Sequence, residues 1–475
     1  MWTETFVFLH YLAALAVSVR VILRPQLEPT VRLSWILVIE LVPLVGIVAY
    51  VMFGEVRMRR ALVETRANVR SHLSGLWTHS PEELRILPEF AAPLIRANQA
   101  TTGFTAVSGN RAALLPEDDS AITTMVEAID GARDHVHILF YIWLDDASGR
   151  AVAEAASRAA RRGVKVRAII DAFGSRPFAR SPAWAAMKQA GAECIIALPL
   201  SLPVIGSLFH RMDLRNHRKI VVIDHVLGFT GSRNCADRDF AVKPRFAPWI
   251  DVLLAIEGPV VRQMQAVFLQ DWMSYTGEDL GDMLQMTRPV SGPGEVAQVV
   301  ATGPDEHRGS LSDSMVTMIH AARERLVITT PYYVPDSALD SAVRSAARRG
   351  VEVTVILPAR NDSLVVQATS EGFYHGLVAA GVRLLLFQEG LLHAKIITVD
   401  GRMAMLGSAN MDRRSFELNY EMNMLFLGGD LTALLDARQQ SYIRRARPVG
   451  PDEIRDWSLA RRLRNNLLAL AAPIL

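Results

Sequence analysis

The sequence contains little cysteine and no excess of charge of either sign. Its 475 residues include 2 cysteines, Cys194 and Cys235, which excludes a disulfide-stapled scaffold and a cysteine-rich metal site and fits a reducing compartment. The 51 Lys and Arg residues nearly balance the 49 Asp and Glu residues, so the formal net charge is +2. A chain without a broad basic field gives no compositional sign of binding nucleic acid.

Hydrophobic residues, in contrast, are plentiful. They make up 50% of the chain, and the mean hydropathy of +0.18 excludes a disordered protein. The excess falls in two apolar runs, 5–23 and 33–53, each close to the roughly 20 residues that a helix needs to cross a bilayer. The N-terminal MWTET has no basic residue and a second run follows the first, which argues against a cleaved signal peptide. We predict that residues 1–60 form a two-helix transmembrane hairpin; the alternative is two helices buried in a soluble core.

Charged residues in and beside these runs bear on membrane topology. Basic residues stand between the runs and, in larger number, after the second one: Arg24, Arg32, Arg57, Arg59, Arg60 and Arg66. Because basic residues gather in cytoplasmic loops, this excess places the C-terminal bulk in the cytoplasm. Glu40, inside the second run, is either a functional intramembrane carboxylate or one that is protonated, faces the partner helix or pairs with Arg20.

The rest of the chain alternates predicted helices and strands, and it repeats itself. MVEAIDGARDHVHI (125–138) matches MVTMIHAARERLVI (315–328), and ASRAARRGVKVRAII (156–170) matches AVRSAARRGVEVTVI (342–356). A helix, a strand, an Arg-Arg-Gly turn and a further strand in one order indicate a parallel β-α-β unit that occurs twice. We predict a connecting segment at 61–110, α/β halves at 111–285 and 296–448, a Gly/Pro-rich linker at 286–295 and a C-terminal tail helix at 449–475. This tail, with the arginine-rich LARRLRNNLLAL before its apolar end, is either a membrane-surface helix or a docked helix.

Each predicted half contains the same polar string, His-x-Lys-x4-Asp followed by Gly-Ser-x-Asn. The first copy supplies His217, Lys219, Asp224, Ser232 and Asn234. The second copy supplies His393, Lys395, Asp400, Ser408 and Asn410 at the same spacings. One such string arises easily by chance, whereas two copies at equal spacing inside a repeated unit indicate a functional site.

These residue types suit chemistry on a phosphate diester. Residues two apart on a strand share a face, so His and Lys of each copy project together, and the Asp falls at the next turn, where it can accept backbone N–H groups. Two ammonium groups and two amides can stabilise a charge-rich phosphoryl transition state. One histidine can attack phosphorus while the other protonates the leaving oxygen. No carboxylate cluster with metal-ligand spacing accompanies the strings, so we expect neither a metal nor another cofactor in this chemistry.

The paired strings resemble the motifs of the phospholipase D superfamily. Together with the apolar N-terminal region, the segments RNHRK (215–219), TTPYYVPD (329–336) and GSANMDRRSFELNYE (407–421) resemble bacterial cardiolipin synthases over nearly the whole chain. The resemblance implies a duplicated phospholipase D-type α/β sandwich whose pseudo-twofold halves share one site. It also implies a carboxylate further along each half that orients the histidine, and the matching positions are Asp251 and Glu421; the plainer interpretation is that both merely end strands.

The resemblance further implies roles for the motif residues. It counts Asp224 and Asp400 with the catalytic His and Lys residues, although we expect both aspartates to hold turns. It makes one histidine the carrier of a phosphatidyl group and the other the general acid and base, and favours His217 as the nucleophile and His393 as the acid and then base. The two serines and two asparagines are expected to bind or support the phosphate.

The implied reaction is transfer of a phosphatidyl group from one phosphatidylglycerol to another, with release of glycerol. The alternatives are a hydrolytic phospholipase D and a transferase that uses another alcohol acceptor. Near-neutral charge argues against a nuclease-type phosphodiesterase, and two intact motifs argue against a non-catalytic scaffold. The expected partners are phosphatidylglycerol and the bilayer, without nucleic acid, in a multi-pass protein of the bacterial cell (inner) membrane whose catalytic part is cytoplasmic. The sequence leaves the oligomeric state open, a homo-oligomer included.

Overall fold

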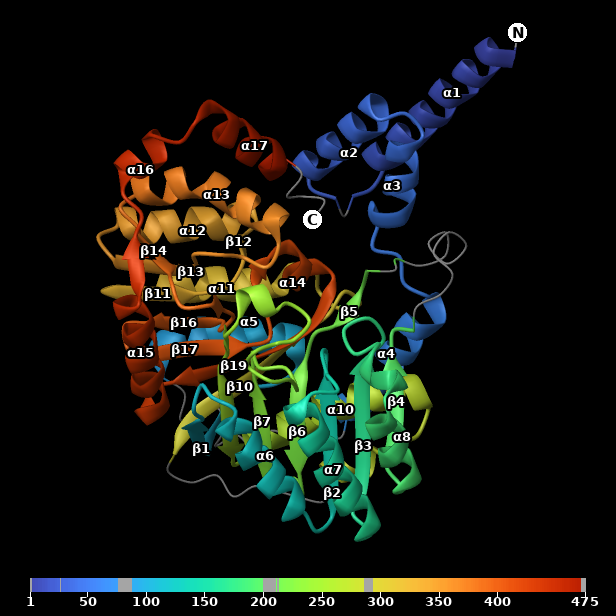
Figure 1. Cartoon of the computed structure of the whole chain (residues 1–475), viewed down its shortest axis with the longest axis vertical. Coiled ribbons are helices and arrows are strands. Elements are labelled where there is room, and N and C mark those ends of the chain that lie inside the picture. The colour runs from blue at the N-terminus through green and yellow to red at the C-terminus, as the bar shows by residue number, and fades with distance from the viewer. Residues whose placement is uncertain are drawn as a thin grey trace.

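The computed structural model describes residues 2–25, 27–75, 88–199, 211, 213–285 and 294–470. Figure 1 shows a helical N-terminal arm that projects from an α/β body. The predicted linker at 286–295 lies almost entirely outside the described residues.

The arm contains helices α1 (Trp2–Ile22), α2 (Pro29–Leu41) and α3 (Val45–Phe53), so the predicted second span is two short helices and not one. The break lies at Pro43, because proline lacks an amide hydrogen and its ring clashes with the preceding helical turn. Val42 accordingly leaves the helical conformation, with φ −119° and ψ 84°, and Leu44 has a positive φ of 60° with ψ −51°.

Helix α3 folds back against α2. Gly46 lies so close to the carbonyl group of Val38 that a Cβ atom would not fit, and Trp35 meets Tyr50 edge to face with ring centroids 5.3 Å apart. These contacts make α2 and α3 an antiparallel pair.

Among the described residues, α1 is the helix that is long and apolar enough to cross a membrane, over Thr3–Ile22 with a mean hydropathy of 1.8. Helix α2 has 13 residues and α3 has 9, so they are about 20 and 14 Å long, short of the ~30 Å hydrocarbon core. Glu40 faces α1, where Ser18 donates a hydrogen bond to it at 3.0 Å. Arg20 pairs with Glu55 instead, at 2.7 Å.

The strands of the body form two copies of one arrangement. The first half is ordered β1-β9-β7-β6-β2-β3-β4, and the second is ordered β10-β19-β17-β16-β11-β13-β14, with β20 added at its edge. The halves join where β1 and β10 pair antiparallel. The strands of the first half are β1 (Val107–Leu114), β2 (His135–Phe140), β3 (Lys165–Asp171), β4 (Glu193–Ala197), β6 (Lys219–Ile223), β7 (Leu227–Gly231) and β9 (Leu253–Glu257). Those of the second are β10 (Glu295–Thr302), β11 (Arg325–Thr329), β13 (Glu352–Pro358), β14 (Arg383–Phe387), β16 (Ile396–Val399), β17 (Met403–Gly407), β19 (Asn419–Leu427) and β20 (Ala446–Pro448). The predicted duplicated α/β fold is thereby confirmed.

Helices cover both halves of the sheet. The outer helices are α6 (Ser120–Asp130), α7 (Ala147–Arg161) and α8 (Pro182–Gln189) in the first half, and α11 (Ser310–Ala321), α12 (Ser337–Arg348) and α13 (Leu364–Ala379) in the second. The inner helices α10 (Val260–Thr276) and α15 (Gly429–Arg444) each contact strands of both halves. Residues of α10 and α15 belong to one apolar core with residues of β6, β16 and β19, so the halves share their hydrophobic interior.

The segment predicted as a connection packs on the body. Helix α4 (Arg60–Gly75) contacts α10, and α5 (Ala92–Thr102) contacts α11 and β10. Arg66 of α4 is fully buried and pairs with Asp271 and Asp305, each at 2.8 Å. Strand β1 begins at Val107, four residues before the predicted boundary of the first half at 111 (111 − 107 = 4).

The chain ends in α16 (Pro451–Arg455) and α17 (Leu459–Leu470). One face of α17 is docked on α13, where Asn465 donates a hydrogen bond to Glu371 at 2.7 Å. The other face exposes Leu459, Leu463 and Leu467 by 81%, 65% and 63%. The tail helix is therefore docked and at the same time presents an apolar stripe.

Candidate active site

Short strands tie each motif histidine to the opposite half of the body. Strand β5 (Arg215–Asn216) pairs with the start of β19, and the amide of His217 donates to the carbonyl of Tyr420 at 2.9 Å. In the same way β15 (Leu391–Leu392) pairs with β8 (Trp249–Ile250), and the amide of His393 donates to the carbonyl of Ile250 at 2.8 Å. Both pairings cross the boundary between the halves, so the two histidines belong to one composite site.

Each histidine contacts a carboxylate of the other half. Nδ1 of His217 lies 3.0 Å from both carboxylate oxygens of Glu421, and Nδ1 of His393 lies 2.6 Å from Oδ1 of Asp251. The expectation that each carboxylate serves the histidine of its own half is therefore wrong. The reason is the strand exchange, since Glu421 lies on β19 beside β5 and Asp251 directly follows β8.

The motif serines hold these carboxylates. Ser232 donates to Asp251 at 2.5 Å and accepts the amide of Val252 at 3.0 Å. Ser408 donates to Glu421 at 2.5 Å and accepts the amide of Met422 at 2.9 Å. The serines thus support the histidine partners, and their hydroxyl hydrogens are engaged by carboxylates.

The motif lysines are buried beside their histidines, on the shared strand face that period two predicts. Nζ of Lys219 donates to the carbonyl of His217, and Nζ of Lys395 to that of His393, each at 2.6 Å. Burial lowers the pKa of Lys219 to about 8 and that of Lys395 to about 7, because it penalises the charged form. A neighbouring phosphate would favour the charged ammonium groups.

The histidines and carboxylates have opposite charge preferences. Burial lowers the pKa of His217 to about 4, against the attraction of Glu421, and also lowers the pKa of His393. Burial alone would raise the carboxyl pKa values, but the adjacent histidines and lysines lower those of Asp251 and Glu421 to about 2. A neutral imidazole that donates through Nδ1 to an ionised carboxylate leaves a lone pair on Nε2.

The two motif asparagines are buried next to the serines. Asn234 is 4% exposed and Asn410 is 6% exposed, and neither side-chain oxygen has a hydrogen-bond partner among the described residues. Their amides are therefore not fully engaged in holding the fold, as expected of groups that meet a substrate.

The motif aspartates lie away from the reacting groups. Asp224 accepts the backbone amides of residues 133–135 at 2.8–2.9 Å, and Asp400 accepts those of residues 323–325 at 2.7–2.8 Å. Each follows the end of β6 or β16 that is opposite to the histidine. Their geometry fits the expected turn-holding role and removes them from the set of groups that can touch substrate.

Three further side chains at the site were not singled out from the sequence. The ring of Tyr141 lies edge-on to His217, and that of Trp249 packs against His393, each with centroids 4.7 Å apart. Arg218 points to the face opposite the motif residues, where it pairs with Asp271 at 2.9 Å. Period two places Arg218 on that face, but no local pattern reveals the two aromatic neighbours.

Two histidine–carboxylate pairs and two buried lysines at the junction of duplicated α/β halves define a phospholipase D-like protein. A family model described as cardiolipin synthase, PLD-like domain, matches residues 125–272 and 315–442, and one described as phospholipase D-nuclease N-terminal matches residues 12–55. The chain therefore belongs to the cardiolipin synthase family, which confirms the resemblance found in the sequence.

Individual relatives agree with this assignment. Cardiolipin synthase A of Edwardsiella ictaluri is 35% identical over 485 residues, covering 99% of this chain and 98% of that protein. Cardiolipin synthase A of Yersinia pseudotuberculosis is 34% identical over 481 residues, with the same shares covered. Among solved structures, phosphatidylserine synthase of Haemophilus influenzae is similar in fold, with a TM-score of 0.59, 14% identity, and coverage of 80% of this chain and 100% of that one.

Proposed function

We propose that this protein is a membrane-bound phosphatidyltransferase that makes cardiolipin from two phosphatidylglycerol molecules. Membership of the cardiolipin synthase family over nearly the whole chain supports the reaction class. The observation that carries the mechanism is the pair of crossed contacts, His217 with Glu421 and His393 with Asp251, because they give one composite site two oriented imidazoles.

In the first step, Nε2 of His217 attacks the phosphorus of one phosphatidylglycerol. The bond from phosphorus to the glycerol oxygen breaks, and protonated His393 gives its proton to that oxygen, so glycerol leaves. The negative charge of the bound phosphate favours the protonated form of His393. Lys219 and Lys395 neutralise the charge on the phosphoryl oxygens.

In the second step, neutral His393 takes the proton of the terminal hydroxyl of a second phosphatidylglycerol. That oxygen attacks the phosphatidyl group on His217, the phosphorus–nitrogen bond breaks, and cardiolipin leaves. The 2.6 Å contact between His393 and Asp251 is short enough for a charge-assisted hydrogen bond, which supports His393 as the residue that carries the proton.

The test uses the purified full-length protein with labelled phosphatidylglycerol in mixed micelles. We expect cardiolipin and glycerol to appear in equal amounts. Phosphatidic acid in place of cardiolipin would indicate a hydrolytic phospholipase D, and a higher rate with an added alcohol would indicate another acceptor.

We also propose a membrane topology with one crossing. Arg20 and Arg24 at the end of α1 pair with Glu55 after α3, at 2.7 and 2.8 Å, so both ends lie on one side. With α2 and α3 as a hairpin that returns to that side, the arginines around the runs all lie with the body. The positive-inside rule then places the catalytic body in the cytoplasm, with one crossing where two were predicted.

Cysteine accessibility distinguishes the two topologies. In a Cys194→Ser background, Thr3→Cys should react with an impermeant maleimide added outside the inner membrane. Thr30→Cys should react with the maleimide only after the membrane has been lysed. Two crossings predict labelling of Thr30→Cys from outside.

A further inference from the structure

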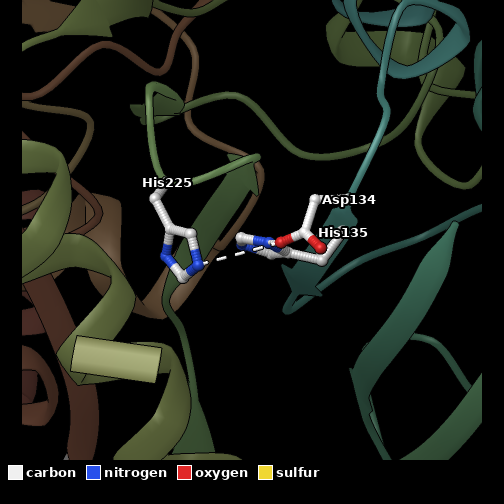
Figure 2. Close-up of side chains that lie close together, drawn as sticks. All are labelled: Asp134, His135 and His225. Carbon is white, nitrogen blue, oxygen red and sulfur yellow. Dashed lines mark hydrogen bonds and ion pairs between the residues drawn. The ribbon is translucent and has the colours of Figure 1, made fainter. Parts of the chain in front are cut away.

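Nitrogen and oxygen ligands gather at the end of the first half that lies away from the active site. Asp134 and His135 lie at the start of β2, and His225 lies in the turn between β6 and β7 (Figure 2). Oδ2 of Asp134 is 2.9 Å from Nδ1 of His135 and 3.9 Å from Nε2 of His225. Two ligands bound at about 2.0–2.1 Å to one tetrahedral ion lie roughly 3.4 Å apart, between these two distances.

His225 supplies a buried ring nitrogen without a partner. Its side chain is 8% exposed, and its Nε2 has no hydrogen bond to any described residue. Figure 2 shows this nitrogen directed at the carboxylate of Asp134. An imidazole nitrogen that makes no hydrogen bond can bind a metal ion.

Gln265 sets the orientation of His135 from behind. Its Oε1 lies 3.3 Å from Nε2 of His135, and its amide nitrogen lies 2.7 Å from Nδ1 of His137. Both ring nitrogens of His135 thus lie next to an oxygen atom, Nε2 next to Oε1 of Gln265 and Nδ1 next to the carboxylate of Asp134 at 2.9 Å. A metal ion at this position would be bound by Nδ1 and the carboxylate together. Metal-bound histidines are commonly oriented in this way by an oxygen behind the ring.

The second half has the same turn without these ligands. The residues at the positions of Asp134, His135 and His225 are Glu324, Arg325 and Gly401. In both halves an aspartate accepts backbone amides of this turn, Asp224 in the first half and Asp400 in the second.

Both turns have a positive φ at the same position. Gly401 has φ 63° and His225 has φ 60°, a left-handed conformation that glycine adopts freely and larger residues adopt at a cost. Arg325 pairs with Asp436 at 2.8 Å, and no cluster of ligands forms there among the described residues. The turn itself therefore does not require imidazoles.

We propose that Asp134, His135 and His225 bind one Zn²⁺ ion, with water as the fourth ligand, and that this ion clamps the start of β2 to the β6–β7 turn. Two imidazoles and a carboxylate are ligands that zinc accepts. The site follows Asp224, at the opposite end of β6 from Lys219, so its role is structural and separate from phosphatidyl transfer.

The test uses full-length protein in detergent, purified without a histidine tag and stripped with a chelator. We expect calorimetry to give one Zn²⁺ per chain, and the melting temperature to rise with the zinc concentration. Co²⁺ should give the visible absorption of a tetrahedral site with nitrogen ligands.

The variants are chosen to keep the fold. Asp134→Asn changes a side chain that is 66% exposed, and His225→Asn keeps a residue that tolerates the left-handed turn. Each should weaken Zn²⁺ binding at least 10-fold and leave phosphatidyl transfer near the unmodified rate. His320→Gln, at an exposed histidine of α11, is the matched control and should bind zinc normally. Zinc binding that is equal in all variants, or a Co²⁺ spectrum of the unmodified protein without nitrogen ligation, would overturn the proposal.

Discussion

At the scale of single residues, each histidine of the candidate site contacts a carboxylate from the other half of the chain. Glu421 holds His217 as the tautomer with a free Nε2, whereas Asp251 acts on His393. A donor lipid with an aryl leaving group needs little acid help, so its covalent step reports on the nucleophile alone. We expect Glu421→Gln to slow labelling of His217 by about 10²–10⁴-fold, in line with loss of a tautomer-fixing carboxylate, and Asp251→Asn to label near the normal rate. Mass spectrometry of quenched time points measures both.

The histidine variants serve as controls for this experiment. His393→Ala should still be labelled on His217, and His217→Ala should stay unlabelled. Slow labelling in Asp251→Asn with normal labelling in Glu421→Gln would contradict the crossed pairing, and label on His393 would reverse the two roles.

The sequence indicated the histidines and carboxylates that the structure brings together, but not how they pair. Period two on a strand placed each lysine beside its histidine, and the repeat implied a composite site. The crossed contacts depend on the two-residue strands β5, β8 and β15, whose partners lie far away in the sequence. Such pairings leave no periodic signal, so the sequence alone assigns each carboxylate to the histidine of its own half.

The buried lysines predict the alkaline limb of activity. Both must be charged to bind the phosphoryl oxygens, and burial has lowered their pKa values to about 8 for Lys219 and about 7 for Lys395. A base with a lowered pKa loses its proton at lower pH, so kcat/KM should fall as the pH rises through about 7–8. Lys395→Arg keeps a charge at every accessible pH, so its residual activity should fall only at higher pH, with Lys219. An unchanged alkaline limb in Lys395→Arg would show that another group controls it.

At the scale of elements, α17 shows how one helix can be docked and still present an apolar surface. Its exposed leucines recur every four residues, whereas Arg461 and Asn465 face Glu371 of α13. Figure 1 places α17 toward the same end of the molecule as α2. An amphipathic helix in this position fits the membrane surface.

The α17 stripe predicts a difference between bilayers and micelles. We expect Leu463→Glu combined with Leu467→Glu to reduce turnover on phosphatidylglycerol vesicles several-fold, because the apolar face no longer enters the interface. Turnover in mixed micelles and the melting temperature should stay unchanged. Leu434→Glu, at a 48% exposed leucine of α15, is the control. Equal loss of activity in micelles would show that the exposed leucines stabilise the folded protein and do not bind the membrane.

The break between α2 and α3 could not be predicted from the pattern of apolar residues alone. The hydropathy pattern shows one apolar run over residues 33–53, because hydropathy does not depend on whether the backbone can form helical hydrogen bonds. Pro43 cannot continue the helix, and Gly46 lets the returning helix approach α2 closely. The proline was visible in the sequence, but the direction of the chain after it depends on packing between the two helices.

At the scale of the whole molecule, the boundary between the membrane arm and the body lies before Arg66. This guanidinium is fully buried against Asp271 and Asp305, and Asp271 also pairs with Arg218 below the active site.

Removing residues 1–59 keeps the α4 helix intact, so the body should fold and act on dispersed short-chain phosphatidylglycerol, with most activity on bilayers lost. Removing residues 1–75 deletes Arg66 and Arg70 and leaves the buried carboxylate of Asp305 without its cationic partners, at a cost of about 3–5 kcal/mol, whereas Asp271 keeps its pair with Arg218. Thermal melting followed by circular dichroism should therefore show a cooperative transition for the shorter deletion and a transition at much lower temperature, or none, for the longer one.

Arg66→Met in the full chain separates loss of the ion pairs from loss of the helix and should reproduce most of the destabilisation. A 1–59 deletion that does not fold would mean that the contacts of residues 56–58 with the body, such as the hydrogen bond from Arg308 to the carbonyl of Val56 at 3.2 Å, belong to the core.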